Sequence, residues 1–121
     1  MVDTVDFLAS NMVGMHFKRF PNLIPEYTSK WMASGNIWLQ RTCLLYQLKY
    51  KENTNTSLLY SWIHSLMDSK EFFIQKAIGW ILREYSKTAP AEVIDFIHNT
   101  NLKPLSKREG LKWMKNKGII E

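Results

Sequence analysis

Apolar side chains recur along this chain with the period of amphipathic helices. Between Phe72 and Tyr85 they fall at positions i, i+3, i+4, i+7, i+8 and i+11, which form one face of a helix with ~3.6 residues per turn. These positions are Ile74, Ala77, Ile78, Ile81, Leu82 and Tyr85. Strand signals are scarce, because the chain has only 5 Gly, no Asn-Gly or Asp-Gly pair and no long alternation of apolar and polar residues. The pattern therefore predicts an all-α protein.

Helices are predicted along most of the chain. Their approximate ranges are 4–16, 23–33, 36–50, 55–66, 71–87, 90–100 and 105–116. Asp3, Asn36 and Ser69 are the predicted N-caps, because short polar side chains at these places can accept the unpaired N–H groups of a first turn. The connections are short and no low-complexity linker interrupts them, so we expect a single domain over residues 1–121.

Part of the sequence repeats. Trp38-Leu39-Gln40-Arg41 matches Phe73-Ile74-Gln75-Lys76 at a shift of 35 residues, and Tyr50 matches Tyr85 at the same shift. A period of about 35 to 45 residues, made of two helices and short turns, is typical of α-solenoids. We therefore expect an α-α superhelix of the HEAT-like or ARM type with about three helical pairs: 23–33 with 36–50, 55–66 with 71–87, and 90–100 with 105–116. The alternative is an ordinary helical bundle, since only two copies match well.

Composition narrows the class of protein further. The 121 residues are 45% hydrophobic and 22% charged, which is enough apolar material for a core and excludes a disordered tail. The single cysteine, Cys43, cannot form an internal disulfide and is too few for a cysteine-based zinc site, so a reducing compartment is expected. The N-terminus carries acids where a signal peptide has lysines, and no apolar run approaches the ~18 residues that span a bilayer. We expect a cytoplasmic protein without a membrane partner.

The net charge of +5 is unevenly distributed. Most of it lies in the last helical region, and cations also line the second helix of each predicted pair. The basic and aromatic positions on these faces are Trp38, Arg41 and Lys49; Lys76, Trp80, Arg83 and Lys87; and Lys107, Arg108, Lys112 and Lys115. A solenoid with cations on successive second helices presents a positive concave surface, which fits a polyphosphate backbone. The alternative is a set of solvated basic helix faces.

Few residue patterns indicate catalysis. His16, His64 and His98 are isolated from one another, none has metal-ligand spacing, and no Gly-rich phosphate loop or nucleophile elbow occurs. Asp6 stands out because it follows Asp3 by three residues. The structural interpretation of this pair is two carboxylates that stabilise the start of a helix.

Several longer motifs resemble the DNA alkylation repair enzyme family, the AlkD-like HEAT-repeat glycosylases that remove N3- and N7-alkylated purines. These motifs are Asp3-Thr4-Val5-Asp6, Trp38-Leu39-Gln40-Arg41, Asp68-Ser69-Lys70-Glu71-Phe72-Phe73-Ile74-Gln75-Lys76-Ala77-Ile78-Gly79-Trp80, Leu82-Arg83-Glu84-Tyr85-Ser86-Lys87 and Pro104-Leu105-Ser106-Lys107-Arg108-Glu109. The resemblance covers essentially the whole chain. It implies helical pairs curved around duplex DNA.

The resemblance also implies roles for individual residues. The catalytic aspartate of the family matches Asp6, its cleft arginine matches Arg41 and a cleft tryptophan matches Trp80. Asp6 would stabilise the positive charge that develops on the deoxyribose as the cationic base departs, and would help place the water. Trp80 would lie against the sugar-phosphate, and Arg41 would bind a neighbouring phosphate. The expected DNA contacts come from Trp38, Lys76, Arg83, Lys87, Lys107, Arg108, Lys112 and Lys115, with no metal or organic cofactor.

Two features depart from the family pattern. The tryptophan that precedes Asp-Thr-Val-Asp in the family is Val2 here, and family members are about twice as long. The chain thus resembles the C-terminal half of such an enzyme. Its alternative functions are a non-catalytic DNA-binding module and a protein-scaffolding solenoid.

The first predicted helix suggests a further partner. Residues 4–16 are nearly all apolar, so both faces of the helix need cover. A terminal repeat in a solenoid must turn a polar face outward. We therefore expect a homodimer through helix 4–16, in addition to duplex DNA that contains alkylated purines as the main partner.

Overall fold

Helices form most of the chain. The computed structural model describes the backbone of residues 2–120 and the side chains of residues 8–120. The α-helices are α1 (Val2–Arg19), α2 (Ile24–Ala33), α3 (Ile37–Leu45), α4 (Thr56–Leu66), α5 (Phe72–Ser86), α6 (Pro90–His98) and α7 (Pro104–Asn116), with 3-10 helices at Pro21–Leu23 and Lys51–Asn53. No strand occurs between residues 2 and 120, so the all-α prediction is confirmed.

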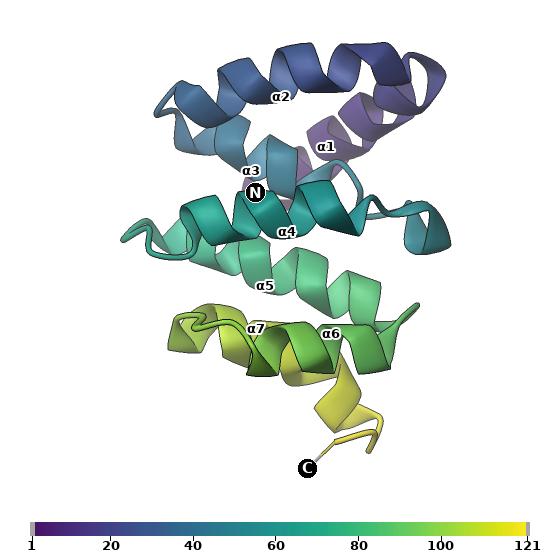
Figure 1. Cartoon of the computed structure of the whole chain (residues 1–121), viewed down its shortest axis with the longest axis vertical. Coiled ribbons are helices and arrows are strands. Elements are labelled where there is room, and N and C mark those ends of the chain that lie inside the picture. Colours follow the sequence, from purple (N-terminus) through teal and green to yellow (C-terminus); the bar gives the residue numbers. More distant parts are fainter. Residues whose placement is uncertain (1, 121) are drawn as a thin grey trace.

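The helices stack along the long axis of the molecule in two layers. In Figure 1, α2, α4 and α6 lie nearer to the viewer, while α3, α5 and α7 lie behind them. Helix α5 packs against both α3 and α7, and α6 packs against α5 and α7. Helix α1 contacts α3 at the N-terminal end of the stack. Consecutive helical pairs therefore build the predicted α-α superhelix.

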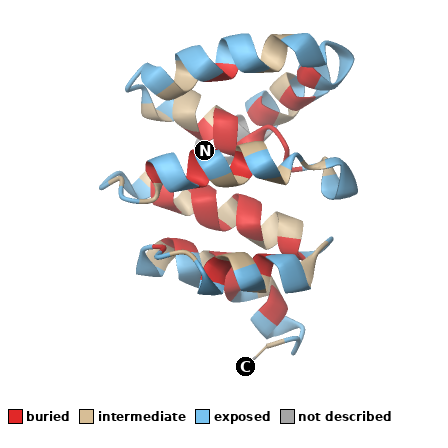
Figure 2. Cartoon of the chain, in the orientation of Figure 1, coloured by how far each residue is buried: buried red, intermediate tan, exposed pale blue. Residues whose placement is uncertain are grey.

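Helix α5 supplies the centre of the core. Five of the six predicted core positions on it are at most 1% exposed: Ile74, Ala77, Ile78, Ile81 and Leu82. The sixth, Tyr85, is half-buried, and its hydroxyl donates to Glu92 at 3.0 Å. Figure 2 shows buried residues concentrated on α5 and on the end of α3. Each buried aliphatic side chain stabilises the fold by ~1.5–3 kcal/mol. The layer that contains α3, α5 and α7 is therefore the most strongly stabilised part of the fold.

Helix α3 is shorter than predicted. It ends at Leu45, residues 46–49 form turns, and Lys51 has a φ of 52°. Tertiary hydrogen bonds hold this segment outside the helix: the Asn55 N–H donates to Gln47 Oε1 at 2.6 Å, and the Tyr50 hydroxyl donates to the Gly14 carbonyl at 2.6 Å. The prediction of a helix over 36–50 is therefore wrong beyond Leu45. Lys49 does not continue the helical face that carries Trp38.

The predicted helix caps had different outcomes. The Asn36 side-chain oxygen accepts from the N–H groups of Trp38 and Leu39 at 2.9 and 3.3 Å, which confirms this cap. Ser69 is not a cap, because Glu71 precedes α5 and the Ser69 hydroxyl instead accepts from the Glu71 N–H at 3.1 Å. The Asp3 side chain lies outside the described residues.

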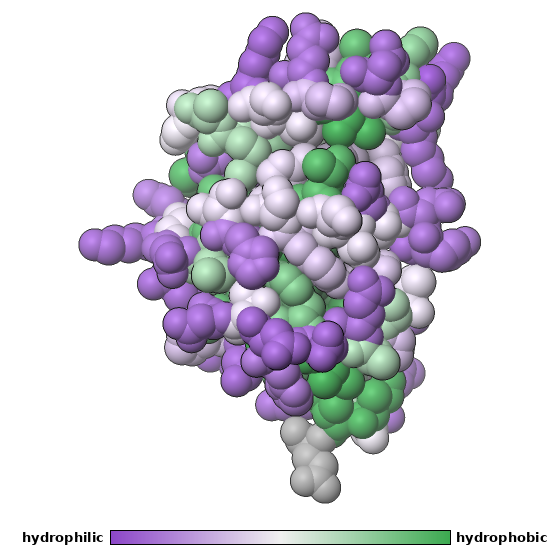
Figure 3. All heavy atoms as spheres, viewed as in Figure 1, coloured by the Kyte–Doolittle hydropathy of each residue, from purple (hydrophilic) through white to green (hydrophobic). Residues whose placement is uncertain are grey.

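One face of the molecule is mainly hydrophilic (Figure 3), and α1 also exposes apolar side chains. On the face shown in Figure 3, hydrophilic side chains project from the whole length of the stack, with apolar atoms between them. Helix α1 exposes three large apolar side chains, Leu8, Met12 and Met15. None of the described helices is long and apolar enough to cross a membrane.

Candidate functional site

A small hollow lies between α5 and α7. Its lining side chains are Lys76, Trp80 and Arg83 from α5 and Glu109 from α7, and its volume is about 130 Å³. All four lining residues are half-buried. Three of them belong to the stripe that the helical spacing predicts, so the structure brings that part of the expected site together.

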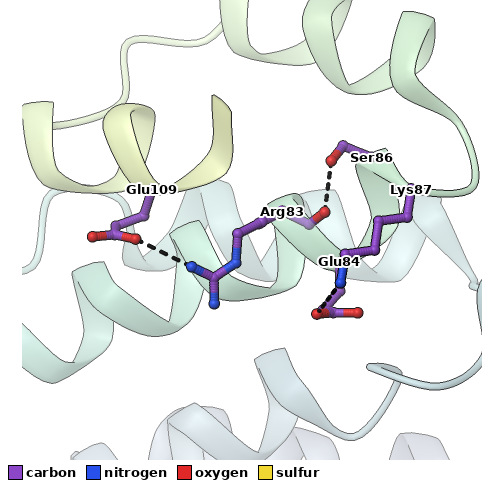
Figure 4. Close-up of polar contacts among 5 residues, drawn as sticks. All are labelled: Arg83, Glu84, Ser86, Lys87 and Glu109. Atoms are coloured by element: carbon purple, nitrogen blue, oxygen red, sulfur yellow. Dashed lines mark hydrogen bonds and ion pairs between the residues drawn. The ribbon is translucent and has the colours of Figure 1, made fainter. Parts of the chain in front are cut away.

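The third cation of the stripe, Lys87, lies apart from the hollow. Lys87 is exposed and does not line it. Its Nζ instead lies 3.0 Å from Glu84 Oε1, in an ion pair within α5. Figure 4 shows this pair pointing away from the Arg83–Glu109 contact. Lys87 thus extends the basic face without belonging to the hollow.

Close packing positions α7 against α5. A Cβ placed on Gly79 would lie 2.5 Å from Glu109 Cβ, so only glycine allows this approach. One turn earlier, the buried Ser106 hydroxyl lies 2.8 Å from the Gln75 carbonyl oxygen and 2.6 Å from Gln75 Oε1. The Gln75 amide in turn donates to the Met67 and Ser69 carbonyls at 3.0 and 2.8 Å. These contacts fix the register between the two helices that form the hollow.

An ion pair connects the two walls of the hollow. Arg83 Nη1 lies 3.4 Å from Glu109 Oε2, and the two side chains are 30% and 22% exposed. Arg83 and Glu109 belong to different helices and point toward each other across the gap (Figure 4). Glu109 was not among the site residues predicted from the sequence. Its place one residue before Gly110 and three after Ser106, both buried, is the feature that could have drawn attention to it. Only the packing of the helices shows that it faces Arg83.

Arg41 is buried rather than open to the surface. It is only 1% exposed, and its guanidinium donates to the Phe73 carbonyl. The guanidinium carbon lies 5.7 Å from the Trp38 ring centre and 5.6 Å from the Phe73 ring centre. Aromatic rings and backbone enclose the Arg41 charge in this structure, and the phosphate contact expected of Arg41 stays a prediction.

Aromatic rings form an exposed ledge above Arg41. The rings of Trp38 and Phe73 are 5.4 Å apart, and those of Phe72 and Phe73 are 5.3 Å apart. Trp38 is 43% exposed and Phe72 is 55% exposed. Lys76 joins the ledge to the hollow, since its Nζ lies 6.0 Å from the Phe72 ring centre. Trp38 was predicted from the sequence as a DNA contact, and Phe72 was not. The exposure of Phe72 depends on its place in the first turn of α5.

The remaining cations of the predicted site lie elsewhere on α7. Lys107, Arg108, Lys112 and Lys115 are all exposed, and none lines the hollow. Helical spacing places Arg108, Lys112 and Lys115 on the side of α7 opposite Ser106 and Gly110, which contact α5. The structure therefore separates this basic face from the cations of α5. The Asp6 side chain lies outside the described residues.

The Cys43 thiol, another group that could react, is buried in the core. Burial raises the pKa of the Cys43 thiol to about 12, so the group is a neutral thiol at physiological pH. Among the described residues, no group of three or more His, Cys, Asp or Glu side chains could hold a metal ion. The α5–α7 hollow remains as the place where a tryptophan, Trp80, lies beside the cations Lys76 and Arg83.

Comparisons with known proteins supply the family context. Residues 1–114 match the family described as DNA alkylation repair enzyme. Among solved structures, a protein from Enterococcus faecalis described as a predicted DNA alkylation repair enzyme is 38% identical to this chain, with a TM-score of 0.80. The match covers 87% of this chain and 49% of that protein, so the chain spans about half the length of its relative. No curated protein matches the sequence.

Proposed function

The chain belongs to the DNA alkylation repair enzyme family, and we propose from this premise that it acts as a monofunctional DNA glycosylase on N3- and N7-alkylated purines in duplex DNA. The observation that carries the proposal is the hollow between α5 and α7. There Trp80, which matches a cleft tryptophan of the family, lies between two cations, Lys76 and Arg83. A flat aromatic wall beside cations fits a sugar-phosphate backbone.

The reaction suits a site with few catalytic groups. The bond between C1′ of the deoxyribose and the purine nitrogen breaks, and its electron pair leaves with the alkylated base. Because that base already carries positive charge, it departs as a neutral molecule. Water then adds to C1′ and releases a proton. An ionised carboxylate beside the developing sugar cation lowers the barrier, and Asp6 is the proposed source of that carboxylate.

Arg41 takes a different part in this proposal from the one that its sequence motif implies. Its buried guanidinium holds the Phe73 carbonyl and lies against the rings of Trp38 and Phe73. We assign it a positioning role, in which it supports the aromatic ledge beside Lys76. The phosphate contacts fall to Lys76, Arg83 and the exposed cations of α7. The site needs no deep pocket, since no step requires the base to be enclosed.

A base-release assay tests this function. Duplex DNA treated with a methylating agent is incubated with the chain, and free 7-methylguanine is measured by chromatography. We expect release by the native chain and a loss of about 10²- to 10³-fold in Asp6→Asn, the typical cost of removing one electrostatic group from a site. Equal release by the native chain and Asp6→Asn would exclude catalysis by Asp6.

The second candidate is a DNA-binding module without catalysis. The chain spans 49% of its relative, and this favours the second candidate because an active cleft can need residues from both halves of such a protein. Duplex binding with no base release by the native chain would support it. Binding to duplex must weaken steeply as salt rises, because each neutralised phosphate releases counterions. If no duplex binds at low salt, a protein-scaffolding role replaces both candidates.

A further inference from the structure

Among the side chains that the structure describes, Glu109 is the only carboxylate that lines the hollow between α5 and α7, and it faces Arg83. A negative side chain in a surface that binds a polyanion normally weakens binding, because like charges repel. Its position is nevertheless fixed by close packing: Glu109 Cβ lies where a side chain on Gly79 would otherwise be. The hydrogen bonds between Ser106 and Gln75 hold the same helix one turn away. Packing thus fixes where the Glu109 side chain begins, and its carboxylate faces Arg83.

Arg83 can satisfy two acceptors at once. A guanidinium carries five N–H donors in a rigid plane, and the contact with Glu109 uses Nη1. Without a partner on α7, this long side chain would sample many rotamers over its exposed surface. The contact with Glu109 limits those rotamers and sets the plane of the guanidinium at the edge of the hollow.

We propose that Glu109 is the positioning residue that orients Arg83 toward a phosphodiester of the DNA strand bound beside Lys76 and Trp80. This inference rests on the proposed function. Lys76 lies seven residues before Arg83 on the same face of α5, so the two cations approach one bound group from either side of Trp80. Bidentate recognition of phosphate depends on the angle of the guanidinium plane, and an oriented Arg83 supplies it.

The inference and simple charge repulsion predict opposite signs. If Glu109 only repels DNA, Glu109→Gln raises the affinity for duplex. If Glu109 orients Arg83, the same change lowers the affinity although the protein becomes more positive. Glu84→Gln is the matched control. It also removes the negative charge of an ion pair, but that pair, Glu84 with Lys87, lies within α5 and neither residue lines the hollow.

The experiment measures binding of an unmodified duplex by fluorescence anisotropy at several salt concentrations. We expect binding about threefold to tenfold weaker in Glu109→Gln, within the range of couplings between contacting residues. Glu84→Gln should bind as tightly as the native chain or slightly more tightly. In an Arg83→Ala background, Glu109→Gln should produce no further loss. Thermal unfolding of all variants verifies that they are folded.

The outcomes separate this inference from the proposed function. If the native chain binds no duplex, the proposed function fails and the inference fails with it. If the native chain binds duplex but Glu109→Gln binds equally or more tightly, or weakens binding in the Arg83→Ala background as well, only the inference is overturned. A third measurement follows the binding of inorganic phosphate by ³¹P NMR. If phosphate binding depends on Glu109 while duplex binding stays unchanged in Glu109→Gln, the hollow is a site for free phosphate. That result also contradicts the inference.

Discussion

Arg41 and Lys76 match each other in the sequence repeat, yet their environments differ. Lys76 is half-buried at the α5–α7 hollow, whereas Arg41 is enclosed by two aromatic rings and a backbone carbonyl. A buried guanidinium is tolerated only when it is well paired, because its desolvation is costly. At the residue scale, we therefore expect Arg41 to contribute to stability and Trp80 to contribute to the proposed DNA site.

Replacement of Arg41 tests its structural role. Arg41→Ala should lower the free energy of unfolding by about 2–4 kcal/mol, since it removes a buried side chain and leaves the Phe73 carbonyl without its donor. Arg108→Ala, at an exposed position, should change it by no more than ~0.5 kcal/mol. Urea denaturation measures both values. An Arg41→Ala protein as stable as the native chain would show that the buried contacts contribute nothing.

Trp80 and Trp62 provide a matched pair of tryptophans. Trp62 is 7% exposed in the core, whereas Trp80 is half-buried at the hollow. Trp62→Ala should cost the ~3–5 kcal/mol typical of a core tryptophan, and Trp80→Ala well under that amount. Trp80→Ala should instead weaken duplex binding or base release. A stability loss of core size at Trp80, measured by urea denaturation, would contradict its assignment to the site.

At the element scale, the contact between α5 and α7 depends on glycine. The nearest atom to a Cβ on Gly79 would be Glu109 Cβ at 2.5 Å, which is backbone-attached and cannot move alone. A Cβ on Gly110 would meet Ile97 and Leu82 atoms at 3.3 Å, a tighter than usual but milder contact. The two helices can therefore approach closely only while residue 79 has no side chain.

Gly79→Ala should destabilise the protein although alanine is the better helix former. The expected cost is about 1–3 kcal/mol from overpacking, net of a gain of ~1 kcal/mol in helix propensity. Gly110→Ala should cost less, because the Ile97 side chain can adjust. Calorimetry of the two variants measures the difference. A Gly79→Ala protein more stable than the native chain would mean that α7 moves away without penalty.

A separate prediction concerns the DNA contacts of the exposed cations on α7. Arg108, Lys112 and Lys115 are exposed and opposite the surface that packs on α5, so we expect them to contact phosphates without reading bases. Replacement of one of them by alanine should weaken binding to all duplexes alike and reduce the salt slope by about one. Anisotropy titrations on duplexes of different sequence measure both effects. A loss confined to one sequence would refute this role.

At the scale of the whole molecule, helix α1 exposes apolar side chains at the N-terminal end of the stack. Leu8, Met12 and Met15 are 60%, 71% and 68% exposed. Beside them lies an apolar hollow of about 420 Å³, lined by Met12, Val13, His16, Phe17, Tyr27 and Trp31. Exposed apolar patches of this kind are typically interfaces. Because α1 presents both projecting methionines and a hollow, a second copy related by a two-fold axis can fill one with the other.

We therefore expect the 14.3 kDa chain to self-associate at high concentration through α1. Light scattering should give a mass that rises toward the dimer, and Met12→Lys should return it to the monomer by placing a charge in the patch. Glu26→Gln, which changes an exposed residue of α2, is the control. A monomer at millimolar concentration would exclude the dimer.

The sequence was sufficient to predict that these helices exist and in what order, because the 3.6-residue period and caps such as Asn36 are local signals. It also placed Lys76, Trp80 and Arg83 on one helical face, since that placement needs only spacing within α5. The end of α3 at Leu45 required tertiary information, because the chain that follows is held by the hydrogen bond that Tyr50 donates to Gly14 and the one that Gln47 accepts from Asn55.

The tertiary structure alone decided which polar groups are buried and which face one another. Arg41 and Lys76 look alike in the repeat, but only the packing of Trp38 and Phe73 covers the arginine. Glu109 lies 26 residues from Arg83 along the chain, and it reaches the hollow because α7 crosses α5 at Gly79. Contacts between helices depend on the distance of approach and on the register, and neither is encoded in the period of a single helix.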